Sequence, residues 1–204
     1  MTGQELKSSL TPEKVLDILR TTGALLEGHF QLTSGRHSDR FFLMPHTLQH
    51  PAQTERLCRA LAGLFAEEGV ETVVGPATGG IILAYEVARQ LERLTGRPVR
   101  AIFTEKTEDG GMALKRQWRL RSGERVLVVE DAITTGGSVV KAIAALQAYQ
   151  PALVGVGCIV DRSRGAVEFG VPLRALVRAE VDSWTPDECP LCRAGVPVVK
   201  PKGN

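Results

Sequence analysis

The chain has 204 residues, of which 43% are hydrophobic and 24% charged, and its formal net charge is +2. These values are typical of a globular protein with one sizeable core, and the small net charge argues against a large nucleic-acid-binding surface. No apolar run approaches the ~20 residues of a membrane-spanning helix, and the first residues lack the apolar stretch of a signal peptide. Four cysteines in a chain of this length fit a reducing compartment. We therefore predict a cytoplasmic protein that binds neither membranes nor nucleic acids.

The N-terminal part of the chain predicts a helix followed by a pair of strands. Thr11 before Pro12 is typical of a helix start, and Gly23 is expected to end that helix. Residues 28–43 combine strand-forming residues with a Ser-Gly turn, which indicates a strand, a turn and a second strand. Leucines at helical spacing then predict a helix over residues 53–68.

Beyond residue 70, short apolar runs alternate with helical stretches. The runs are apolar without alternation, as expected of strands that are covered on both faces. Strands are predicted at 72–77, 99–105, 125–131, 153–162 and 173–181, and helices at 80–94 and 138–149. This alternation indicates an α/β fold with a mainly parallel central sheet flanked by helices. We expect one domain over residues 1–204, with a small hood from about 1–50, a core over 51–185 and a C-terminal tail over 186–204.

The most informative motif is VLVVEDAITTGGS at residues 126–138. Glu130 and Asp131 follow a buried strand, at the sheet edge where open parallel sheets bind ligands. The hydroxyl and glycine residues at 134–138 open a helix, whose free N–H groups and dipole suit a phosphate. The carboxylates can hold sugar hydroxyls, or a Mg²⁺ that bridges to phosphate oxygens. The motif favours a ribose 5-phosphate ligand over the alternative of a simple Gly-rich turn with solvated acids.

This motif resembles the signature of type I phosphoribosyltransferases, which bind 5-phosphoribosyl 1-diphosphate (PRPP). GHFQLTSGRHSDRFF (28–42) is similar to the orotate-binding segment of orotate phosphoribosyltransferases, and GPATGGI (75–81) is similar to their pyrophosphate-side loop. VDR (160–162) matches the position of an orotate-binding arginine, and the resemblance runs from about Leu16 to Glu180. It implies the type I phosphoribosyltransferase fold with a small N-terminal hood. It also implies Mg²⁺-dependent transfer of the phosphoribosyl group from PRPP to orotate, which gives orotidine 5′-phosphate and diphosphate in pyrimidine biosynthesis.

The resemblance assigns roles to the acidic pair and to two basic residues. Glu130 and Asp131 would hold the ribose hydroxyls, and Lys106 would meet the pyrophosphate; these three are the candidate catalytic residues. Arg162 would pair with the orotate carboxylate through its planar guanidinium. The other candidates are Thr134, Phe41 and Phe42 on the orotate side; Ala132, Ile133, Thr134, Thr135, Gly136, Gly137 and Ser138 around the 5′-phosphate; and Thr78, Gly79 and Gly80 at the pyrophosphate. Mg²⁺ is expected to arrive with PRPP, without direct protein ligands.

The long polar stretch at 104–123 is expected to be a functional or disordered loop. The resemblance implies a mobile lid that is often shared with a neighbouring subunit, and hence a homodimer. The lid Lys and His of many relatives have no counterpart here, and Gly79 stands where some relatives have Lys. Lys115 and Arg116 are the lid candidates, with Arg119 also available. Which of them reaches the diphosphate stays open, and the alternative is a solvated basic loop.

Cys189 and Cys192 have the spacing of metal ligands. A structural zinc site needs a second ligand pair, and Cys58 and Cys158 lie in a predicted helix and strand in unrelated contexts. The sequence therefore favours reduced structural cysteines over a metal site.

His29 and His37 flank the predicted strand pair of the hood. They could line the orotate pocket, although a partly exposed, hydrogen-bonding histidine is the more usual explanation.

Two other functions remain open at this point. A phosphoribosyltransferase for a purine base would share the phosphate-binding motif, but it would need no cationic partner such as Arg162 for its base. A non-catalytic regulator of the same fold would sense PRPP and bind nucleic acid, which the small net charge argues against.

Overall fold

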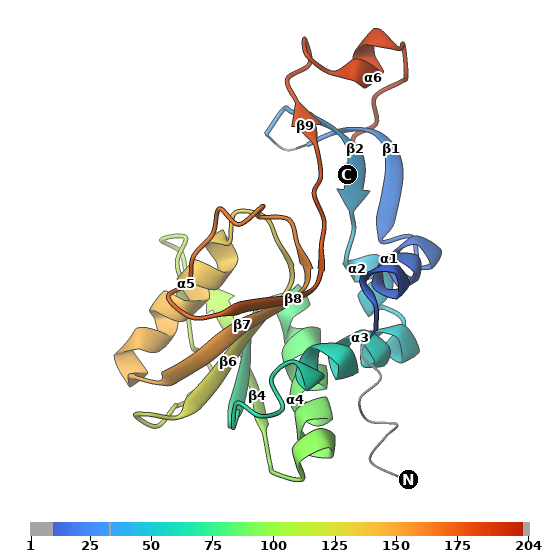
Figure 1. Ribbon diagram of the computed structural model, residues 1–204. Coiled ribbons are helices and arrows are strands. Elements are labelled where there is room, and N and C mark those ends of the chain that lie inside the picture. Colours follow the sequence, from blue (N-terminus) through green and yellow to red (C-terminus); the bar gives the residue numbers. More distant parts are fainter. Residues whose placement is uncertain (1–9, 33, 202–204) are drawn as a thin grey trace.

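The computed structural model describes residues 10–32 and 34–201, and the remaining positions of the predicted hood and tail lie outside it. A six-stranded sheet crosses the core in the order β5-β4-β3-β6-β7-β8 (Figure 1). Five strands are parallel: β3 (Thr72–Pro76), β4 (Arg100–Lys106), β6 (Arg125–Ile133), β7 (Ala152–Asp161) and β8 (Leu173–Arg178). The short β5 (Met112–Ala113) runs antiparallel to β4. The predicted α/β class with a mainly parallel sheet is confirmed.

Helices cover both faces of this sheet. The helices of the described chain are α1 (Pro12–Thr21), α2 (Pro45–Leu48), α3 (Pro51–Gly63), α4 (Gly79–Thr95), α5 (Gly137–Leu146) and α6 (Pro190–Arg193), with a short 3₁₀ turn, η2 (Gln147–Tyr149). Helices α1, α3 and α4 pack on one face, and α5 packs on the other (Figure 1). Among the residues that the structure describes, no helix is long and apolar enough to cross a membrane.

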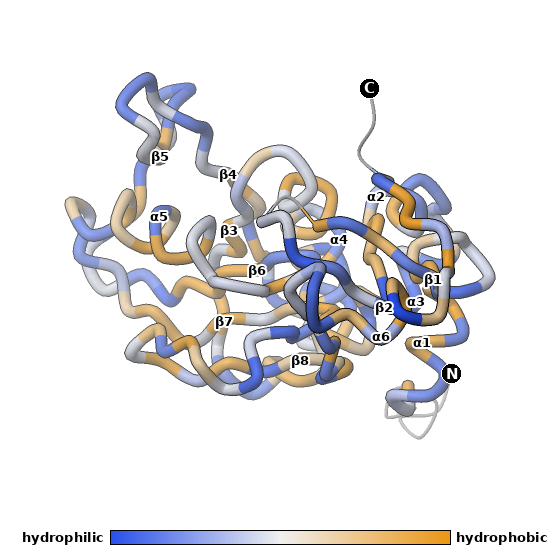
Figure 2. Tube along the Cα trace, turned by 90° about the horizontal axis from the view of Figure 1, so that it is seen from above, coloured by the Kyte–Doolittle hydropathy of each residue, from blue (hydrophilic) through white to orange (hydrophobic). Residues whose placement is uncertain are grey.

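The two-sided covering explains the apolar run of β6. Leu127 and Val129 belong to the core beneath α3 and α4, whereas Val126 and Val128 belong to the core beneath α5. All four side chains are fully buried. Figure 2 shows the hydrophobic central strands and, in contrast, the polar hairpin around β5. Successive residues of a strand point to opposite faces, so a strand buried on both faces needs no polar alternation.

The first helix begins and ends where the sequence predicts. The hydroxyl of Thr11 accepts a hydrogen bond from the Lys14 N–H at 3.4 Å, and Pro12 occupies the first turn. Gly23 follows the C-cap with a φ of +72°, a left-handed conformation that glycine adopts without a steric penalty.

A second, three-stranded sheet forms the hood in the order β1-β2-β9. Strands β1 (Leu25–Gln31) and β2 (His37–Phe42) come from the N-terminal region, whereas β9 (Ser183–Trp184) lies after the core. The chain then passes through α6 and returns to β1, where the Val199 N–H donates to the His29 carbonyl at 2.8 Å. The structure thus places residues 183–199 against the hood (Figure 1), whereas the sequence predicts core up to residue 185 and a tail from residue 186.

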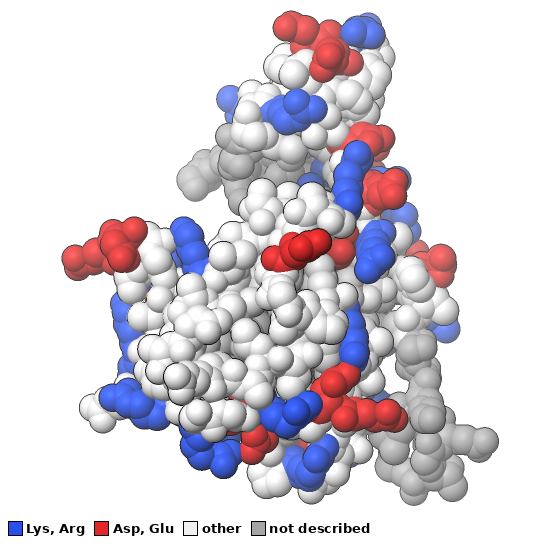
Figure 3. Space-filling model, turned by 60° about the vertical axis from the view of Figure 1, so that its left-hand side comes forward, with Lys and Arg blue, Asp and Glu red and all other residues white. Residues whose placement is uncertain are grey.

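The surface shown in Figure 3 carries acidic and basic side chains around a largely uncharged central area. The charges of both signs are interspersed along its margin.

Candidate active site

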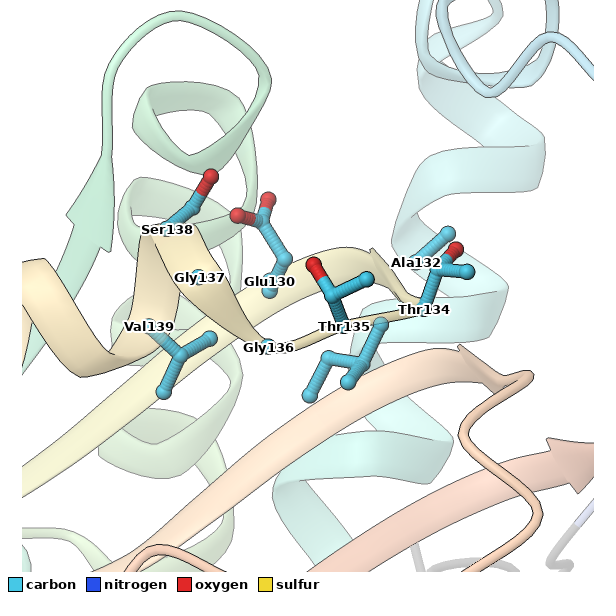
Figure 4. Close-up of a pocket in the computed structure, with 9 residues that line it drawn as sticks. Glu130, Ala132, Thr134, Thr135, Gly136, Gly137, Ser138 and Val139 are labelled. Carbon is cyan, nitrogen blue, oxygen red and sulfur yellow. The ribbon is translucent and has the colours of Figure 1, made fainter. Parts of the chain in front are cut away.

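The end of β6 and the loop into α5 enclose a cavity of ≈ 210 Å³ (Figure 4). The residues that line it are Glu130, Ala132, Ile133, Thr134, Thr135, Gly136, Gly137, Ser138 and Val139. The structure therefore brings the predicted phosphate-binding residues together with Glu130 at the carboxyl edge of the sheet. Val139 was not predicted, and its side chain points away into the core.

The loop before α5 depends on a glycine at its sharpest point. Gly136 is the N-cap residue of α5, with a φ of +70°. A Cβ atom there would lie 2.6 Å from the Val167 side chain, so both the conformation and the space require glycine. In Figure 4 the hydroxyls of Thr135 and Ser138 and the carboxylate of Glu130 point to the same side of the loop. Because the first N–H groups of a helix have no partner within it, this arrangement suits a phosphate.

The acidic pair is partly buried. Burial, together with a smaller contribution from the neighbouring charge of Asp131, raises the pKa of Glu130 to about 8. Burial also raises the pKa of Asp131, whose N–H donates to the Glu130 carboxylate at 3.1 Å. Within the described residues neither carboxylate forms a salt bridge. Hydroxyl donors or a cation supplied by a ligand would therefore stabilise the charged forms.

The loop after β3 lies directly against this acidic pair. Helix α4 begins at Gly79 after Thr78, and the Ala77–Thr78 peptide bond is cis. A Cβ atom at Gly79 would lie 2.7 Å from Oδ2 of Asp131. A side chain at this position would therefore displace the Asp131 carboxylate. The predicted pyrophosphate loop and the acidic pair are therefore adjacent.

Arg162 lies between the core and the hood. Its backbone N–H donates to the Ile133 carbonyl at 2.7 Å, which joins the end of β7 to the end of β6. Its guanidinium lies 5.1 Å from the ring centroid of Phe42, in hood strand β2. Burial lowers the pKa of Arg162, and its buried Nε has no hydrogen-bond partner among the described residues. A buried donor without an acceptor is costly, so this geometry fits an anionic ligand.

The other orotate candidates, Phe41, Phe42 and Thr134, lie in different surroundings. Phe42 contacts Arg162, but Phe41 packs against Phe30, with 5.9 Å between ring centroids. Thr134 is exposed in the loop that lines the cavity.

The lid candidates fold back on β4 and are not brought to the cavity. Lys106 is exposed at the end of β4, and its carbonyl accepts a hydrogen bond from Nζ of Lys115 at 3.0 Å. Arg116 forms an ion pair with Glu105 at 2.8 Å and lies 5.5 Å from the ring centroid of Phe103. In this arrangement neither Lys115 nor Arg116 lines the cavity.

His29 and His37 do not have the partial exposure that the sequence favoured. Both are buried, at 3% and 5% exposure, and they lie beside Cys189 and Cys192 in the hood. The sequence could not show this proximity, because the two pairs lie at opposite ends of the chain.

Comparisons with known proteins show the family of this chain. Residues 47–169 match the phosphoribosyl transferase domain family. The chain is 51% identical to the orotate phosphoribosyltransferase of Desulforamulus reducens over 189 residues, which cover 93% of this chain and 95% of that protein. It is 49% identical to the orotate phosphoribosyltransferase of Thermus thermophilus, with 90% and 97% covered.

Solved structures show the same likeness. The orotate phosphoribosyltransferase of Mycobacterium tuberculosis in complex with inorganic phosphate has a TM-score of 0.66 at 27% identity, covering 81% of this chain and 94% of that one. Its complex with PRPP has a TM-score of 0.63 at 26% identity, with 82% and 96% covered.

Proposed function

This chain belongs to the orotate phosphoribosyltransferase family, and from that premise we propose how its residues carry out the family's reaction. The enzyme transfers the 5-phosphoribosyl group of PRPP to orotate, a step in pyrimidine nucleotide synthesis. The observation that carries the assignment of the site is the cavity at the end of β6, where the carboxylate of Glu130 and a hydroxyl-rich helix N-terminus face one space (Figure 4).

PRPP binds with its ribose at the acidic pair and its phosphates in the two neighbouring loops. Glu130 and Asp131 accept hydrogen bonds from the ribose 2′ and 3′ hydroxyls, and residues 134–138 hold the 5′-phosphate. Thr78, Gly79 and Gly80 present backbone N–H groups to the diphosphate. The close approach of Gly79 to Asp131 supports this placement of ribose and diphosphate in neighbouring sites. Ribose C1, which carries the diphosphate, then lies between the acidic pair and the diphosphate loop.

The oxygen-rich surroundings of the site fit Mg²⁺, which prefers oxygen ligands and keeps several waters. We propose that Mg²⁺ binds through PRPP, near the carboxylates of the acidic pair and without a direct protein ligand. When bound, Mg²⁺ neutralises charge on the departing diphosphate.

Orotate binds between Arg162 and the phosphate loop. The unpartnered Nε of Arg162 supports a bidentate contact of its guanidinium with the orotate carboxylate, and the ring of Phe42 holds the guanidinium in place. Thr134 lies on the cavity side of the same ligand.

The chemical step joins orotate N1 to ribose C1 as the bond from C1 to the diphosphate breaks, and the proton of N1 is released to solvent with the departing diphosphate. Positive charge develops on the ribose in the transition state. The partly buried carboxylates of Glu130 and Asp131 stabilise that charge. Positioning of the two substrates by Arg162 and the phosphate loop supplies the remaining rate enhancement.

The lid and the oligomeric state are part of the same proposal. Lys106, with Lys115 or Arg116, closes over the diphosphate after the ion pair between Arg116 and Glu105 opens. A homodimer shares this lid.

Ile82 and Tyr85, three residues apart on α4, are 46% and 67% exposed and offer an apolar contact surface for a second copy. The cytoplasmic location stays a prediction.

A direct assay tests the substrate. The full chain is mixed with Mg²⁺, PRPP and orotate, and the decline of orotate absorbance is followed, with adenine, hypoxanthine and uracil in parallel. We expect turnover of orotate alone. Turnover of a purine without turnover of orotate would reject the proposal, as would salt-dependent nucleic-acid binding without release of diphosphate.

A further inference from the structure

A second group of chemically reactive side chains lies in the hood, at the far end from the parallel sheet (Figure 1). It comes from β1, from β2 and from the turn into α6. We call it the hood cluster, and its members are His29, His37, Cys189 and Cys192. One ligand atom from each residue lies within 4.8 Å of all the others. The phosphoribosyl chemistry uses none of these side chains.

The distances within the hood cluster are close to those of a four-coordinate metal site. Sγ of Cys189 and Sγ of Cys192 lie 3.4 Å and 3.7 Å from Nε2 of His29. Sγ of Cys192 lies 3.2 Å from Nδ1 of His37, and the two imidazole nitrogens are 2.8 Å apart. Ligand atoms around a tetrahedral zinc ion, with bonds of about 2.0–2.3 Å, are separated by roughly 3.3–3.8 Å. Shifts of ~0.5 Å would therefore produce tetrahedral coordination.

The surroundings of His29 orient it as a ligand. Its Nδ1 lies 2.8 Å from the carbonyl oxygen of Val196. A carbonyl can only accept, so Nδ1 carries the proton and Nε2 presents its lone pair to the hood cluster. A ligating histidine in metal sites commonly donates its other N–H to a backbone carbonyl in this way.

The burial of the hood cluster fits a structural ion. His29, His37 and Cys189 are buried, and Cys192 lies at the edge that faces solvent. Two thiolates and two imidazoles fill four positions and leave no open site for a substrate. This ligand set prefers Zn²⁺ to the oxygen-seeking Mg²⁺.

We propose that the hood cluster binds one structural Zn²⁺. Binding releases the two thiol protons to solvent and leaves the proton of His37 on Nε2, so that two thiolates balance the charge of the ion. A structural zinc site needs a second ligand pair, and Cys58 and Cys158 do not supply it. In the hood cluster this second pair is His29 from β1 and His37 from β2. The ion joins the segment after β9 to the N-terminal strands, alongside the backbone hydrogen bonds of Val199.

Metal analysis of the full chain, purified without chelators from zinc-containing medium, tests the proposal. We expect one zinc per chain in the wild type and in the matched controls Cys58→Ala and His50→Gln, whose side chains lie outside the hood cluster. Cys189→Ser with Cys192→Ser should lose the zinc, and removal of zinc should lower the Tm of the wild type by about 5 °C or more.

Cobalt substitution of the wild type keeps the test decisive if the variants fail to fold. Co²⁺ in the hood cluster should show the intense visible absorption and thiolate charge-transfer bands of a tetrahedral site with two sulfur ligands. Wild-type protein without zinc that also fails to bind added Zn²⁺ or Co²⁺ would overturn the proposal. So would a Cys189–Cys192 disulfide in protein isolated under reducing conditions, or a zinc content that the double variant retains.

Discussion

The guanidinium of Arg162, at the end of β7, lies 5.1 Å from the ring centroid of Phe42, in β2 of the hood. The hood and the core thus meet at the residue that the proposed function assigns to the orotate carboxylate. An aromatic face attracts a cation but does not satisfy its N–H groups. The guanidinium is therefore positioned by the hood while its donors stay available to a ligand.

Replacing Arg162 with Ala should raise the KM for orotate about 10- to 100-fold, which corresponds to the 1.5–3 kcal/mol of a charged hydrogen bond. The KM for PRPP should change much less. Steady-state kinetics with each substrate varied in turn measures both constants. Arg93→Ala, which removes an exposed ion pair with Glu55 on the surface, is the control. Equal increases in both KM values would contradict the assignment.

The double variant Glu130→Gln, Asp131→Asn should lose roughly 1,000-fold or more in kcat/KM, because two charges facing the developing positive ribose are removed. The fold should survive, since the carboxylates make no ion pair in the described structure and their charges are costly to bury. Circular dichroism and thermal unfolding check the fold. Glu168→Gln, in an exposed loop, should keep full activity. Normal turnover by the double variant would show that the acidic pair serves another purpose.

The stability of the ligand-free protein should fall as pH rises through the range that Glu130 titrates. Its pKa is raised from 4.5 in the unfolded chain to about 8 in the folded state. Between these values the folded state binds more protons than the unfolded state, so the free energy of unfolding decreases with increasing pH. Denaturant unfolding at about pH 5 and about pH 9 measures the decrease in the wild type and in Glu130→Gln. The variant should show a smaller decrease, and an identical pH dependence in both proteins would refute the role of burial.

Gly79→Ala should raise the KM for PRPP about tenfold, because the added methyl group would meet Oδ2 of Asp131 at 2.7 Å and displace it. Gly63→Ala, at the end of α3, is the matched control, since its Cβ would meet nothing within 4 Å. This control should keep wild-type kinetics. If Gly79→Ala also behaves like the wild type, the close approach of the two loops has no part in binding PRPP.

The main strands and helices could be predicted because local signals specify them. The run over Val126–Val129 marks a strand covered on both faces, and Thr11-Pro12 marks a helix start. The two-residue strands β5 and β9 carry no periodic signal. They form strands only because a longer partner is in place, which local sequence does not reveal.

Part of the candidate site could likewise be predicted from local sequence, and part could not. The acidic pair and the phosphate loop are contiguous in sequence, so one motif predicts most of the cavity. The contact of Arg162 with Phe42 and the approach of His29 to Cys189 join distant segments. The packing of the hood on the core creates the first, and the return of the C-terminal segment creates the second. Neither contact can be recognised from the spacing of the residues in the sequence.

That returning segment has a consequence for synthesis on the ribosome. Strands β1 and β2 emerge before the core strands, but β9 and Val199 emerge after them. The core over β3 to β8 can collapse on the nascent chain while the hood still lacks its third strand. The nascent chain therefore completes its hood only after the strands of the core have emerged.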